Sequence, residues 1–290
     1  MSFSLRRMVP WAAWVLFAAP AIAQAPSVAL VPNYKPGAHF LYSLHIHSSI
    51  STRATLDTVA EVEMQILPGS GLGRFRAAAR FTHFSTTVKA ESANDQAALE
   101  VQSAATDKAA VSMQPAQFEV SSAGLQILAR TPGADYDQPV DMLEELIRTD
   151  SLPTGAVSVG SRWTRARSRA IPGMNASVPL TMDCSLASLG TRDGAAVATI
   201  QVQAHGEAVL PPDALPGAAA LEAQGVVPDA HVSVATDSSA VYRAADAVLL
   251  EITSQSHNQL QIKLIGGPQP QSSTTDSTSS ATVKLEKIFE

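Results

Sequence analysis

The sequence predicts a mainly β or α+β protein in which curved antiparallel sheets wrap around one central helix, with a β-sandwich as the alternative. Several segments alternate between apolar and polar residues, which is typical of strands with one buried face. One segment near the middle carries the apolar stripe of an amphipathic helix. Glycine and proline clusters lie between these segments and indicate turns.

The N-terminus has the features of a secretory signal peptide. Arg6 and Arg7 precede an apolar run from about Met8 to Ala19, and a small-x-small motif ends at Ala23. The run is shorter than the about 20 apolar residues of a membrane span. We therefore expect cleavage after Ala23 and a periplasmic or extracellular protein without a transmembrane span. An uncleaved N-terminal anchor is the alternative.

Charge and cysteine content restrict the partners that we expect. Loss of the leader removes two arginines and no acid, so the net charge changes from −6 to −8. An acidic surface argues against binding to nucleic acid or to anionic membranes. Cys184 is the only cysteine, so the chain cannot form an internal disulfide and must be stabilised by a buried core.

The first β-rich half is expected at residues 24–134. Apolar residues recur at every second position over 56–66, and after a glycine-rich turn over 75–81, which predicts a long hairpin. Residues 94–114 indicate a helix or a loop. A short hairpin with Gly124 at its turn completes this half.

Residues 135–163 are expected to form the central helix and the connection to the second half. Leu143, Leu146 and Ile147 give the helix a narrow apolar stripe. Trp163, the only tryptophan left after leader cleavage, opens the next strand. The helix is therefore expected to be either one wall of a ligand cavity or the element that fills it.

The second β-rich half is expected at residues 164–265. Its long hairpin places Met182 on the inner face and turns at Asp193-Gly194. A Gln/Ser/Thr-rich run at 266–280 indicates a mobile low-complexity loop, and 281–290 the final strand. Because both halves contain a long and a short hairpin, a duplication is possible.

Three groups of residues invite a functional interpretation. His45 and His47 point the same way on a strand, but no third ligand follows at a fixed spacing, so an exposed polar face is favoured over a metal site. His83 falls on the same side of the predicted strand as Phe75 and Phe81, which are expected to face inward. It is interpreted as a core histidine, as a pocket residue, or as turned outward by a bulge that brings Phe84 inward.

Arginines alternate at positions 165, 167 and 169, so they share one face of a strand. Such an arrangement can hold an anionic head group. A solvated strand face, or a sheet edge guarded by charge, is the favoured interpretation.

One set of short motifs resembles a known family. Leu152-Pro153, the run Val157-x-Val159-Gly160-Ser161-x-Trp163, Ile171-Pro172 and the turn from Arg243 to Leu249 are similar to the middle of a family of exported bacterial β-rich proteins of unknown function. The family implies no catalytic residues. Ala247 stands where the family often has glycine, so that turn is expected to differ. Periplasmic lipoprotein carriers offer an analogy at the level of the fold alone.

The sequence contains neither a G-x-S-x-G nor an H-E-x-x-H motif, and it implies no catalytic residue, metal or cofactor. We expect a non-catalytic binding or carrier module for a lipid, another apolar or amphiphilic small molecule, or a cell-envelope protein. The alternative is a hydrolytic enzyme with a dispersed site around His83 or the His45/His47 pair. The residues expected to line a ligand site are Phe75, Phe81, His83, Leu146, Trp163 and Met182.

Overall fold

The computed structural model describes residues 26–289 except 52, 70, 122–123, 130–137, 172–173, 175, 216 and 267–270. The predicted signal peptide and its cleavage site lie outside the described residues, as does the start of the predicted central segment. The described chain forms one large antiparallel sheet and one two-stranded sheet.

The secondary structure elements follow in chain order. The large sheet contains β2 (His39–Ile50), β3 (Ala54–Ile66), β4 (Phe75–Ala90), β5 (Ala116–Ser121), β6 (Gly124–Ala129), β8 (Arg162–Ala170), β9 (Ser177–Arg192), β10 (Ala195–Leu210), β11 (Val227–Arg243), β12 (Leu249–Ile265) and β13 (Gln271–Phe289). The small sheet pairs β1 (Ser27–Val28) with β7 (Val157–Ser158). The helices are α1 (Ala93–Ser112), α2 (Gln138–Ile147) and α3 (Ala218–Glu222), with a 3-10 turn at Pro212–Ala214.

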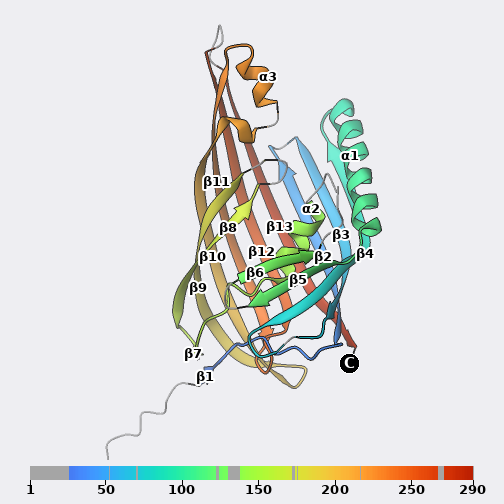
Figure 1. Cartoon of the computed structure of the whole chain (residues 1–290), viewed down its shortest axis with the longest axis vertical. Coiled ribbons are helices and arrows are strands. Elements are labelled where there is room, and N and C mark those ends of the chain that lie inside the picture. The colour runs from blue at the N-terminus through green and yellow to red at the C-terminus, as the bar shows by residue number, and fades with distance from the viewer. Residues whose placement is uncertain are drawn as a thin grey trace, which may run out of the picture.

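The large sheet curves around α2 without closing into a barrel (Figure 1). Its strand order is β6-β5-β4-β3-β2-β13-β12-β11-β10-β9-β8, so β6 and β8 are the two end strands. Val140, Leu143, Leu146 and Ile147 of α2 are buried in the main apolar cluster. The predicted mainly β fold with a curved antiparallel sheet around a central helix is confirmed, and one continuous sheet replaces the sandwich alternative.

The alternation read from the sequence matches the buried faces of the long strands. Ala60, Val62, Met64 and Ile66 of β3 are all less than 5% exposed, and their polar neighbours face outward. Of the two alternatives for 94–114, the helix is confirmed, and it corresponds to α1. The hairpin between β9 and β10 turns at Asp193-Gly194, where both residues have positive φ as a type I′ turn requires.

The loop predicted for 266–280 is wrong for residues 271–280, because these residues belong to β13. This strand lies between β12 and β2; residues 271–284 pair with β12 and residues 277–289 pair with β2. Backbone hydrogen bonds to β12, and to β2 from Ser277 onward, hold it extended whatever its side chains are. Because polar side chains occupy both faces, the sequence lacks the alternation that marks the other strands. β13 also joins the two predicted halves into one sheet.

Helix α1 covers the part of β4 that β5 leaves unpaired. The backbone N–H of Thr86 donates to the Asp107 carboxylate (3.0 Å). The Gln96 side chain accepts from the N–H of Ala90 (2.6 Å) and donates to the carbonyl of Val88 (2.9 Å). Side chains of α1 thus bond to backbone groups of β4 that no strand pairs, which protects this edge from pairing with another chain.

A polar belt divides the concave face of the sheet into two apolar regions. The larger cluster packs on α2, and a smaller one, with Val178, Leu180 and Val232, packs on α3. Thr236 and Ser256 hydrogen-bond across the belt at 2.9 Å. The belt consists of half-buried residues that share the inward parity of their strands: Ser48, Thr236, Ser238, Ser254, Ser256, Asn258, Ser277 and Ser279.

Candidate functional site

The structure brings together five of the six residues that the sequence predicts to line a ligand site. They lie in or against the apolar cluster around α2: Phe75, Phe81, Leu146, Met182 and Trp163. The Trp163 indole N–H donates to the carbonyl of Ser151 at 3.0 Å, which fixes the ring against the connection after α2. Because α2 occupies the concave side, these residues form packed core around it. Their role in binding stays a prediction.

His83 is the exception, and its predicted inward placement is wrong. The pairing of β3 with β4 shifts register at Thr82, so that Glu61 pairs with His83 and Val62 with Phe81. One extra residue reverses the parity of a strand. His83 is exposed, while Phe84 is buried and packs edge-on against Phe81. The bulge alternative is therefore confirmed.

All seven histidines lie on the outer face of the large sheet, opposite the core: His39, His45, His47, His83, His205, His231 and His257. The predicted exposed face at His45 and His47 is confirmed. His47 Nδ1 lies 2.7 Å from the Asp57 carboxylate, and this hydrogen bond holds the pKa of Asp57 below its usual value. The sequence predicts a shared face only for His45 and His47, because the other histidines join that face only after strands far apart in the chain are aligned.

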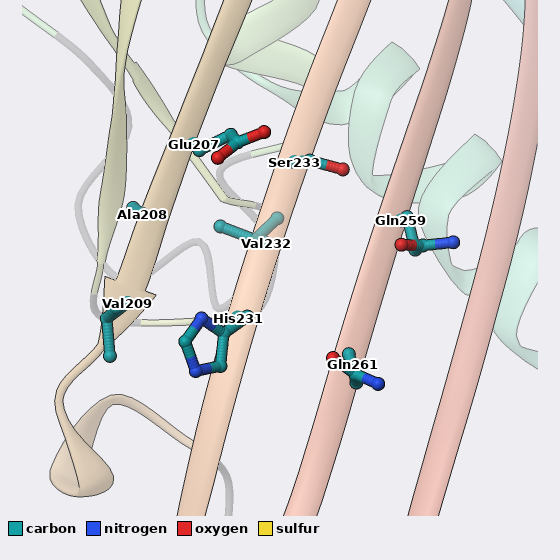
Figure 2. A pocket seen from close by; sticks show the side chains of 8 residues that line it. All are labelled: Glu207, Ala208, Val209, His231, Val232, Ser233, Gln259 and Gln261. Carbon is teal, nitrogen blue, oxygen red and sulfur yellow. The ribbon is translucent and has the colours of Figure 1, made fainter.

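The outer face also carries shallow polar hollows. Figure 2 shows one of about 310 Å³, where Glu207, Ser233 and Gln259 form one row across three strands. His231 and Gln261 stand in the next row. The lining offers hydrogen-bonding groups but only short aliphatic side chains, so it has little to hold an apolar ligand.

Arg165, Arg167 and Arg169 of β8 face the concave side of the sheet, as Trp163 does. Arg167 donates to both carboxylate oxygens of Glu145 at 3.0 and 2.9 Å, and its side chain is 15% exposed. Arg165 donates to the carbonyl of Leu152 at 3.0 Å. The interpretation as a solvated face is wrong for Arg167, because α2 supplies a carboxylate that spacing within one strand cannot reveal. β8 is nevertheless an end strand, as the charged-edge alternative requires.

Arg148, just after α2, lies among three carboxylates. Its guanidinium is 3.0 Å from Glu144, 3.3 Å from Asp150 and 3.8 Å from Glu145. Burial lowers the pKa of Arg148, but the three carboxylates together raise it above its ordinary value. Glu144, Glu145 and Asp150 are thus already engaged by Arg148 and Arg167.

A second cavity, which we call the seam pocket, lies between elements from opposite ends of the strand order. It measures about 370 Å³ and is bordered by the β5–β6 hairpin, by β8, by the connection after α2, and by the segment before β2. Its volume falls within the ~300–1,000 Å³ range of small-molecule sites. Leu30, Val120, Leu125, Leu152 and Pro153 form its apolar lining. Its polar side chains are those of Ser121, Arg148, Thr149, Asp150, Thr154 and Arg165.

Among the described residues, Arg165 is the pocket arginine that forms no direct ion pair. Within the described ranges, no carboxylate lies within ion-pair distance of its guanidinium, and its one hydrogen bond goes to the Leu152 carbonyl. Asp150, which also lines the pocket, forms its ion pair with Arg148 at 3.3 Å. The sequence flagged Arg165 only as one of three alternating arginines, and the pocket draws on four segments that no local pattern connects.

Burial of acidic groups predicts that the protein loses stability in alkali. Burial raises the pKa of the Cys184 thiol from 9.0 to about 11, and that of the Tyr242 phenol from 10.0 to about 12. The unfolded chain releases these protons first, so the free energy of unfolding falls as the pH rises from 9 towards 12. Each group contributes a slope of at most about 1.4 kcal/mol per pH unit.

Urea unfolding at a series of pH values measures this slope. Cys184→Ala should reduce the slope between pH 9 and 11 and leave it unchanged at neutral pH. An identical slope in the variant would contradict the assignment to the thiol.

The described part of the chain contains neither a cluster of metal-ligating side chains nor a helix that could span a membrane. No three His, Cys, Asp or Glu side chains there lie close enough together to hold a metal ion. None of the helices that the structure describes has the length and apolar character needed to cross a bilayer. The chain matches no protein-family model and no curated protein. The resemblance drawn from the motifs around Trp163 therefore stays a prediction.

Proposed function

We propose that the protein is an exported, non-catalytic binding or carrier module that takes an apolar or amphiphilic ligand into the seam pocket. One observation supports this most directly. The pocket combines an apolar lining with an arginine that has no carboxylate partner in the described chain, a combination typical of ligand sites. The concave core, where a ligand was first expected, is occupied by α2. A cell-envelope protein remains the other candidate occupant.

Titration of the purified protein with a neutral solvatochromic dye such as Nile red tests the proposal. We expect saturable binding with one site per chain. Leu125→Asp, which places a charge on the apolar lining, should weaken binding at least about tenfold, because a carboxylate must then be desolvated beside the ligand. Leu128→Asp is the matched control, since Leu128 lies on the same strand but is 41% exposed.

Two outcomes count against the proposal. One is the absence of saturable binding by the wild type. The other is an equal loss in both variants while circular dichroism remains native. A pocket that binds no dye but is protected from hydrogen exchange by envelope extract would favour the protein partner instead.

The hydrolase alternative rests on the outer-face histidines. His47 and Asp57 make a histidine–carboxylate pair, but both side chains are more than a third exposed. In the described chain, no serine hydroxyl hydrogen-bonds to His47, so no activated nucleophile completes the pair. Ester hydrolysis that is lost in His47→Asn would favour this alternative over the binding module.

A further inference from the structure

We propose that the ligand of the seam pocket is a single-tailed amphiphile with an anionic head group, and that Arg165 holds the head. This inference rests on the proposed binding function. The apolar lining alone would accept neutral ligands equally well. Arg165 adds a positive charge to the seam pocket, and this charge favours anionic over neutral head groups among ligands with similar tails.

The position of Arg165 follows from the register of β8. Trp163 pairs with Cys184 and Arg165 with Met182, so both side chains point to the concave side of the sheet. The neighbouring Arg167 reaches α2 and binds Glu145, whereas Arg165 reaches the pocket. The Leu152 carbonyl fixes one end of its guanidinium.

The head group is inferred from the hydrogen-bond donors that remain. A guanidinium has five N–H donors, and Arg165 uses one of them in its bond to Leu152. The described carboxylates nearby, Glu144, Glu145 and Asp150, are bonded to Arg148 and Arg167 instead. A carboxylate or phosphate ester can accept two parallel hydrogen bonds from adjacent N–H groups of the guanidinium, which the Leu152 carbonyl cannot do.

The tail is inferred from the lining and the size of the cavity. Leu30, Val120 and Leu152 are nearly buried, and Leu125 and Pro153 complete an apolar surface beside the guanidinium. A volume of about 370 Å³ lies at the lower end of the small-molecule range. It has room for one acyl chain, not for the paired chains of a bilayer phospholipid.

Calorimetric titration of the full mature chain with dodecanoate, dodecanol and acetate separates head from tail. We expect dodecanoate to bind roughly ten- to hundredfold more tightly than dodecanol, the range of one charge-assisted hydrogen-bonded pair. Acetate, which has the head without the tail, should bind at least about a hundredfold more weakly than dodecanoate. Dodecyl phosphate in a parallel titration tells whether carboxylate or phosphate is preferred.

Variants of β8 assign the selectivity to one residue. Arg165→Gln should reduce the ratio of the affinities for dodecanoate and dodecanol to near one. Arg165→Lys should leave an intermediate ratio, because lysine keeps the charge but lacks the planar pair of N–H donors of a guanidinium. Arg169→Gln is the matched control on the same strand face, and Arg169 does not line the pocket. Melting curves confirm that each variant is folded.

The outcomes distinguish this inference from the proposed function. Equal affinity of the wild type for dodecanoate and dodecanol overturns the head-group inference and leaves the binding function standing. Acetate that binds as tightly as dodecanoate also overturns it, because the tail would then contribute nothing. Failure of all three compounds to bind overturns both.

Discussion

Replacing Leu146 with aspartate should abolish the cooperative unfolding transition of the protein. Leu146 is 8% exposed and packs with Leu143 and Ile147 between α2 and the sheet. Loss of a buried leucine side chain alone costs about 2–5 kcal/mol. An ionised carboxylate in the same place adds a desolvation penalty. Together these approach the whole stability of a typical domain, about 5–15 kcal/mol.

Thermal and urea unfolding followed by circular dichroism measure this effect. The matched control is Leu72→Asp, the same substitution at a leucine that is 75% exposed, and it should melt like the wild type. A Leu146→Asp protein with a native melting curve would mean that α2 is a removable wall and not part of the core.

Gly206→Ala should destabilise the protein by about 1–3 kcal/mol or more, the cost of overpacking a rigid site. A Cβ at position 206 would lie 2.2 Å from the Pro179 carbonyl oxygen and 2.7 Å from the Leu180 side chain. The obstacle is backbone, so no side-chain rotation relieves it. Gly206 follows the last residue pair of β9 and β10, His205 with Thr181, and lets β9 continue close by.

The control for this prediction is Gly190→Ala in the same pair of strands. The nearest atom to a Cβ there is a Val197 methyl at 4.0 Å, an ordinary contact. Chemical unfolding of both variants gives the comparison. Equal stabilities for the two would show that β9 can move away from β10 at little cost.

Local patterns were sufficient to predict most of the strands, because each long strand has one face on the core. The alternation of β3 and the Asp193-Gly194 turn are local properties and were read correctly. The alternation alone does not predict the bulge at Thr82, because an apolar residue follows on either side of the strand: Phe81 on one and Phe84 on the other. The strand at β13 was missed because its pairing partners, not its own residues, keep it extended.

The candidate site was harder to predict than the fold. Trp163 and the alternating arginines of β8 stand out in the sequence, but the residues opposite them come from α2 and from the β5–β6 hairpin. Which arginine finds a carboxylate depends on how Glu145 lies across from Arg167. That is a tertiary property, and it leaves Arg165 without a partner in the described chain.

The polar belt of the concave face weakens the coupling between the two ends of β11 and β12. Side chains such as Ser238 and Ser254 bury little apolar surface, so little packing along these two strands joins the cluster on α2 to the cluster on α3. On β9 the two clusters are adjacent, because Leu180 of the smaller cluster and Met182 of the larger one share one face of the strand. Regions with backbone hydrogen bonds but little packing tend to open first. The ends of β11 and β12 near α3 can therefore fray more readily than β9, which stays packed beside Arg165.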